Sequence, residues 1–101
     1  MTDFDRVEQE LIGHYAAGDY RAALEVLDRA GPDLSGQWER VAYWRACLLA
    51  RCGRVADAVD VLRQAFEAGA WWSPRLLELE SDLDPLWEHP GYRPLLEAME
   101  E

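Results

Sequence analysis

The 101-residue sequence predicts an all-α protein, and three observations support this class. Apolar residues recur every three or four positions, which is the period of an amphipathic helix. No stretch alternates apolar and polar residues, so we expect no β-sheet. A shift of 35 residues aligns Gly18 with Gly53 and superposes two similar segments, GDYRAALEVLDRA and GRVADAVDVLRQA. Internal similarity of this kind predicts a repeated helical hairpin.

The first hairpin is expected in residues 3–31. Val7, Leu11 and Tyr15 follow helical spacing, and Gly18 is a suitable C-terminal cap for the helix that carries them. A second helix is expected to begin at Tyr20 and to end before Gly31-Pro32.

The second hairpin is expected in residues 36–69. Ser35 or Gly36 can start its first helix, and Gly53 ends it. The apolar side of this helix carries Trp38, Val41, Trp44, Leu48 and Leu49. Ala58 of the following helix is aligned with Ala23 of the first hairpin. We expect both alanines at the crossings of paired helices, where a larger side chain would force the backbones apart.

Residues 70–101 depart from the repeat and are expected to form short helices that cap the last hairpin. Ser73-Pro74 and Asp84-Pro85 read as helix starts, and Tyr92 lies in a final short helix. We expect Trp38, Trp44 and Trp87 in the core, with at least one of the consecutive pair Trp71 and Trp72 exposed. Taken together, residues 1–101 are predicted to be a single domain.

The net charge of −10 limits the classes of partner. All ten basic residues are arginines, against twenty acidic ones, so nucleic acid and anionic membrane surfaces are not expected partners. The acidic start of the chain lacks the features of a secretory signal. Cys47 and Cys52 are poorly spaced for a disulfide within one helix, which favours a reducing, cytoplasmic setting.

A known family shares the pattern G-x-x-x-x-A-L/V-x-x-L-x-x-A, which occurs twice here with a helix expected before each copy. The pattern resembles the tetratricopeptide repeat, whose period is about 34 residues. The tail Asp82-Leu83-Asp84-Pro85-Leu86-Trp87 resembles the segment that closes many bacterial arrays of this repeat. The resemblance implies a right-handed α-α superhelix of two hairpins with a short helical cap. It also implies a scaffold that binds a peptide or partner domain in a concave groove.

Catalytic chemistry finds little support in the sequence. His14 and His89 lie 75 residues apart without a spaced serine and aspartate around either. The serines all precede expected helix starts, where capping explains them. The acidic pairs Glu78/Glu80 and Asp82/Asp84 support solvated surface or a weak calcium contact, and we favour solvated surface. We therefore expect no enzyme, no catalytic residue, no cofactor and no bound metal.

A protein-binding function is favoured instead. The resemblance places the first helix of each hairpin along the groove, and the second unit would present Arg40, Tyr43, Trp44, Cys47 and Arg51. The first unit would present Arg6, Gln9 and Gly13, and the arginines could meet a carboxylate of a bound peptide. Trp71 and Trp72 form a second possible contact patch. Two alternatives stay open: a self-associating structural module, including a homo-oligomer, and an acidic inhibitor or immunity-type protein that masks a basic surface.

Overall fold

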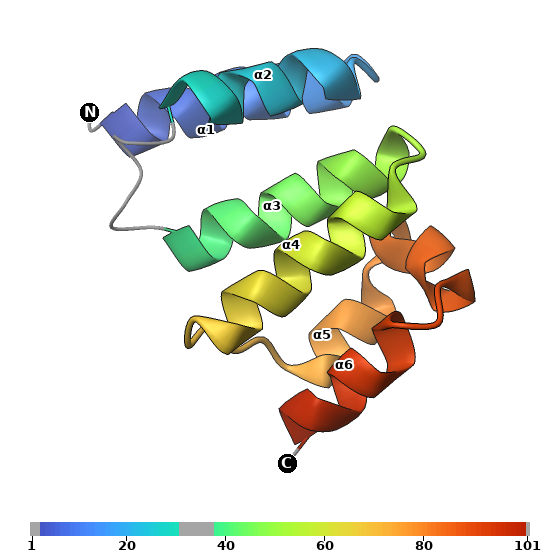
Figure 1. Ribbon diagram of the computed structural model, residues 1–101. Helices are drawn as coiled ribbons and strands as arrows, with labels where there is room; N and C mark the ends of the chain where they lie inside the picture. The colour runs from blue at the N-terminus through green and yellow to red at the C-terminus, as the bar shows by residue number, and fades with distance from the viewer. Residues whose placement is uncertain (1–2, 31–37, 101) are drawn as a thin grey trace.

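Figure 1 shows the computed structural model, which describes residues 3–30 and 38–100. Every regular element in these ranges is a helix, so the predicted all-α class is confirmed. The elements are α1 (Asp3–Ala16), α2 (Tyr20–Ala30), α3 (Trp38–Arg51), α4 (Val55–Glu67), α5 (Pro74–Leu79), the 3-10 helix η2 (Ser81–Glu88) and α6 (Tyr92–Glu100). The predicted helix start at Ser35 or Gly36 lies outside the described residues. No helix in the described ranges is long and apolar enough to cross a membrane.

The helices form three successive layers (Figure 1). The hairpins α1–α2 and α3–α4 are the first two layers, and α2 packs on α3 to join them. The third layer is the C-terminal segment of α5, η2 and α6. Within it, η2 packs on both α3 and α4, and α6 packs on α4. The α3–α4 hairpin therefore lies in the centre of the molecule.

Both hairpins turn in the same way, which explains the matched glycines of the repeat. Gly18 has a φ of +77° and Gly53 a φ of +81°, a left-handed conformation that side chains with a Cβ rarely adopt. After Gly18 the Asp19 amide donates to the His14 carbonyl at 2.9 Å. After Gly53 the Arg54 amide donates to the Leu49 carbonyl at the same distance. These bonds satisfy carbonyls that the helix ends leave free.

The remaining repeat positions form the core. Ala23 and Ala58 are both 0% exposed, as expected for small residues where two helices cross closely. Leu27 and Leu62 occupy the next aligned positions and are also fully buried.

The C-terminal segment covers the α3–α4 hairpin with a buried tyrosine at its centre. The Tyr92 side chain is fully buried, and its hydroxyl donates to the Leu77 carbonyl at 3.5 Å. The Trp87 ring meets the Tyr92 ring edge-on, with centroids 4.9 Å apart. Leu77, Leu83 and Leu86, from α5 and η2, are fully buried as well. This segment thus buries apolar surface that the hairpin alone would expose.

Several local predictions are wrong. The helix expected to start at Asp84-Pro85 begins at Ser81 instead, as a 3-10 helix that contains Pro85. By contrast, the predicted start of α5 is confirmed, with Ser73 as N-cap and Pro74 as the first residue, although the Ser73 side chain makes no capping hydrogen bond. Trp38 and Trp87, expected in the core, are 39% and 37% exposed, because their helix faces are only partly covered by neighbouring layers.

Candidate functional site

A cleft of about 710 Å³ lies along α3, between α1 and the chain that enters α5. We call this surface the α3 cleft. Most of its lining comes from α3, while Glu8 belongs to α1 and Leu76 to α5. The lining side chains are Glu8, Trp38, Glu39, Arg40, Tyr43, Trp44, Trp72 and Leu76. Three tryptophans, a tyrosine and a leucine give this surface its apolar part, beside two carboxylates and a guanidinium.

Apolar side chains around the α3 cleft remain exposed to solvent. Trp38 and Leu76, which line it, are 39% and 48% exposed. Ile12 follows Glu8 by one turn of α1, Leu79 follows Leu76 by about one turn of α5, and both are exposed. Single exposed apolar residues are ordinary, whereas the lining of this cleft holds two of them, Trp38 from α3 and Leu76 from α5.

A smaller hollow of about 220 Å³ adjoins the cleft and shares Tyr43 and Trp44 with it. We call it the inner hollow. Its lining side chains are Leu11, Tyr15, Tyr43, Trp44, Cys47, Leu48, Glu80 and Asp82. The Tyr43 ring also packs against the Trp72 ring, with centroids 6.4 Å apart. The two hollows therefore form one continuous surface along α3.

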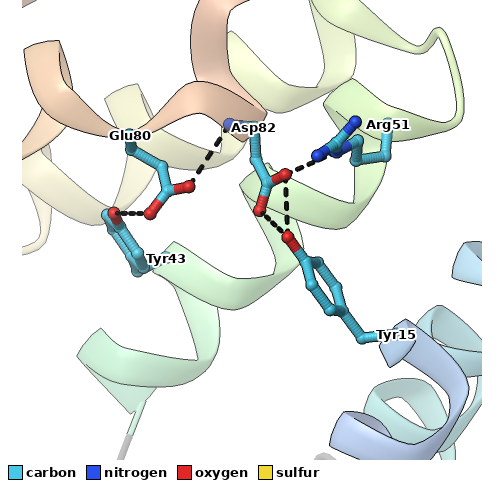
Figure 2. Close-up of polar contacts among 5 residues, drawn as sticks. All are labelled: Tyr15, Tyr43, Arg51, Glu80 and Asp82. Atoms are coloured by element: carbon cyan, nitrogen blue, oxygen red, sulfur yellow. Dashed lines mark hydrogen bonds and ion pairs between the residues drawn. The ribbon is translucent and has the colours of Figure 1, made fainter. Parts of the chain in front are cut away.

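Asp82 is the centre of a polar network at the inner hollow (Figure 2). Its carboxylate oxygens accept the Tyr15 hydroxyl at 2.7 and 2.9 Å and also accept the Arg51 guanidinium. Glu80 accepts the Tyr43 hydroxyl at 3.1 Å and the backbone amide of Asp82 at 3.2 Å. Figure 2 shows these side chains converging from α1, α3 and the start of η2, where Glu80 is the N-cap. The network links the first, second and third layers.

Burial explains why Asp82 needs these partners. The residue is only 5% exposed, and a buried carboxylate is costly unless it is paired and hydrogen-bonded. Arg51 supplies the opposite charge while its guanidinium also lies 5.5 Å from the centre of the Tyr20 ring. The sequence-based expectation that Asp82 is solvated surface is therefore wrong. We call Tyr15, Arg51 and Asp82 the interlayer latch.

The protonation of these groups suits a structural network. The hydrogen bond to Asp82 raises the pKa of the Tyr15 phenol, and burial raises the pKa of Tyr43. The hydrogen bond to Asp82 also raises the pKa of Arg51. Burial raises the pKa of the Cys47 thiol well above its usual range, which keeps it protonated and poorly nucleophilic.

Three potential metal ligands meet beside the inner hollow. One ligand atom each from Cys47, Glu80 and Asp82 lies within 4.8 Å of the others. A metal would need the thiolate, whereas burial holds this thiol protonated, and Arg51 already occupies the Asp82 carboxylate. A protonated Cys47 thiol and an Asp82 carboxylate paired with Arg51 are therefore poor ligands for a metal.

The described residues contain no arrangement for acyl transfer. His89 Nδ1 accepts the Gly91 amide at 3.0 Å, which assigns that side chain to a turn. No hydrogen bond within the described part of the chain joins a serine or cysteine to a histidine, as nucleophile activation requires.

The structure brings together only some of the residues proposed from the sequence. Arg40, Tyr43 and Trp44 line the α3 cleft, and Cys47 lines the inner hollow. Arg51 lies in the latch. Arg6, Gln9 and Gly13 are exposed on α1, where Glu8, Leu11 and Tyr15 face the two hollows instead.

The consecutive tryptophans have different environments. Trp72 is 8% exposed and lines the α3 cleft, so only its edge is available to a partner. Trp71 is 56% exposed, and its indole N–H donates to the Met99 carbonyl at 2.9 Å. At least one of the pair is thus exposed, as expected.

Sequence reasoning missed Tyr15, Glu80 and Asp82 as partners of α3, and it missed Leu76 in the cleft. A carboxylate in a short acidic run gives no local sign of burial, because its contacts depend on how η2 crosses α3. Leu76 carried a usable signal, since an apolar residue three positions before Leu79 predicts one apolar face of α5.

Comparison with known proteins identifies the family of this helical domain. The family model described as A/B hydrolase-like, N-terminal domain matches residues 4–101, which is nearly the whole chain. The chain belongs to the A/B hydrolase-like N-terminal domain family. No curated protein and no solved structure gave a significant match.

Membership of the A/B hydrolase-like N-terminal domain family corrects the resemblance to the tetratricopeptide repeat. That assignment is wrong: the matching model is of another family and spans both hairpins and the C-terminal segment. The pattern misled because its glycine ends a helix and its alanine lies at a helix crossing, as Gly53 and Ala58 do here. Any closely packed helical hairpin favours a glycine at the end of its first helix and a small residue where the two helices cross.

Proposed function

We propose that this chain is a non-catalytic protein-interaction domain that binds a partner in the α3 cleft. One observation carries the proposal: two large apolar side chains that line one cleft, Trp38 of α3 and Leu76 of α5, stay exposed to solvent. Protein contact sites combine aromatic anchors with a polar rim, and Trp38, Trp44 and Trp72 are aromatic residues of that kind.

The proposed partner is an A/B hydrolase-like domain, carried by the same or another polypeptide. The description of the matching family, an N-terminal domain of A/B hydrolase-like proteins, favours this partner. A helical domain without a nucleophile–base pair in its described residues suits an accessory role beside such a domain. The two free cysteines favour a reducing, cytoplasmic setting.

Self-association through Trp71 and Trp72 has less support. Trp72 is nearly buried, and the Trp71 indole N–H is already engaged by Met99. Two copies of a chain with a net charge of −10 also repel each other.

A capture experiment with matched variants tests the proposal. The cleft variant combines Trp38→Ala with Leu76→Glu, and both residues are exposed enough for the fold to survive. The control variant combines Ala56→Glu with Gln64→Ala on exposed positions of α4, so both variants gain one carboxylate. Helical content and thermal unfolding confirm that each variant is folded.

The expected result is enrichment of a protein with an A/B hydrolase-like domain by the wild type and by the control variant. The cleft variant should bind that protein at least about tenfold more weakly, as loss of a central apolar anchor does. Equal binding by the wild type and the cleft variant would contradict the proposal.

A further inference from the structure

The chemistry of the α3 cleft also specifies what kind of segment it accepts. We propose that the occupant is a cationic amphipathic helix of the partner protein. This inference rests on the proposed function, because it names the segment of the partner that enters the same cleft.

The dimensions and lining of the cleft favour a helix. The α3 residues that line the two hollows run from Trp38 to Leu48, which corresponds to about 15 Å along the axis of that helix. A partner helix needs roughly three turns to cover this length. Its apolar stripe would meet the apolar side chains that α3 and α5 contribute to the cleft, in the manner of a helix bound in a groove.

The polar groups of the inner hollow argue against an extended peptide. An extended segment carries backbone amides and carbonyls that need hydrogen-bond partners when they are buried. The described residues form no strand whose edge could supply them. The Tyr43 hydroxyl is bound to Glu80, and the Asp82 carboxylate is bound to Tyr15 and Arg51. The backbone amides and carbonyls of a helix form hydrogen bonds with each other, so a bound helix needs no backbone partners from the cleft.

The charge of the surface selects a basic partner. The lining of the α3 cleft contains two carboxylates, Glu8 and Glu39, against one guanidinium, Arg40. The whole chain carries a net charge of −10, so a basic partner is attracted to the protein in general. Lysines or arginines that flank the apolar stripe of the partner helix would meet these carboxylates at the rim.

Three synthetic peptides test this inference by isothermal titration calorimetry with the full chain. The first is an amphipathic helix of leucine and lysine, about 14 residues long, to match the length of α3. The second carries glutamate in place of every lysine. The third keeps the lysines but has a central proline, which breaks the helix.

Matched protein variants separate the cleft from the overall charge. The rim variant combines Glu8→Lys with Glu39→Lys, and the control combines Glu88→Lys with Glu97→Lys on exposed positions of η2 and α6. Both variants change the net charge by the same amount. The lysine helix should bind the wild type and the control alike, and it should bind the rim variant about tenfold more weakly, from two exposed ion pairs.

The inference is supported if the lysine helix binds at least about tenfold more tightly than both other peptides and loses affinity only in the rim and cleft variants. The inference is overturned if the three peptides bind equally well or if the lysine helix does not bind. It is also overturned if the control variant weakens binding of the lysine helix as much as the rim variant does. A mass that rises with concentration for the chain alone would assign the cleft to a second copy and also overturn it. If no peptide binds while capture of the partner protein is still weakened by the cleft variant of Trp38 and Leu76, the helix inference is wrong and the proposed function stands. If that partner binds the cleft variant normally, the proposed function falls too.

Discussion

Replacement of Asp82 by asparagine should lower the free energy of unfolding by about 2 kcal/mol, since it removes the charge that holds three layers together. The Asp82 carboxylate is almost fully buried and accepts both Tyr15 and Arg51. An asparagine has the same shape, but its single carbonyl is uncharged and its amide cannot accept a hydrogen bond.

The magnitude follows from the contacts of the latch. Hydrogen bonds to a charged group contribute roughly 1.5–3 kcal/mol, more than neutral ones. The side chain of Arg51 is 41% exposed and that of Tyr15 is also accessible, so water replaces part of what they lose. A value near the lower end of that range, about 2 kcal/mol, is therefore expected. It corresponds to a fall in Tm of about 10 °C for a domain of this size.

Urea denaturation followed by circular dichroism measures this change. Asp84→Asn is the matched control, because it removes the same charge from an exposed position two residues away. Tyr15→Phe completes a double-mutant cycle, in which we expect a coupling energy of about 1 kcal/mol with Asp82→Asn. The reasoning is refuted if Asp82→Asn and Asp84→Asn agree within about 0.5 kcal/mol, the usual effect of a surface substitution.

Three further predictions concern the core and its titrating groups. Burial raises the pKa of Tyr92 to about 12. The protonated phenol therefore contributes to stability fully below pH ~10, and this contribution is lost as the pH rises toward ~12. Alkaline denaturation should show the loss, and Tyr92→Phe should make the free energy of unfolding depend less on pH in that range. A thiol reagent should modify exposed Cys52 in the native protein and buried Cys47 only after unfolding; equal rates would contradict the burial. Ala58→Leu should cost at least about 2 kcal/mol by overpacking a helix crossing, whereas exposed Ala56→Leu should be nearly neutral in the same denaturation assay.

Local chemistry made the hairpins predictable from the sequence. Gly18 and Gly53 have backbone conformations that favour glycine, so their shared role is visible as a repeat. Ala23 and Ala58 are fully buried where small size is required, and their spacing from the glycines marks the second helix of each hairpin. These constraints act within about ten residues, which is why they can be read along the chain.

The family and the latch were not predictable in the same way. Hairpin geometry imposes its pattern on many families, so the pattern predicted the helices correctly and the family wrongly. Asp82 is joined to Tyr15 across 67 positions of sequence, and its burial depends on where η2 lies on α3. Arg40, Tyr43 and Trp44 were proposed as partner-binding residues from the sequence and line the α3 cleft, whereas Glu8 and Leu76 required the placement of α1 and α5.

Photo-crosslinking from the α3 cleft tests the central claim most directly. A benzophenone crosslinker placed at Leu76 would face any partner in the cleft, and the same crosslinker at Ala56 on α4 serves as the control. The account predicts an adduct from position 76 with a protein that carries an A/B hydrolase-like domain, formed through a basic helix, and no such adduct from position 56. An equally strong adduct from position 56, or none from position 76 while the partner remains bound, would contradict it.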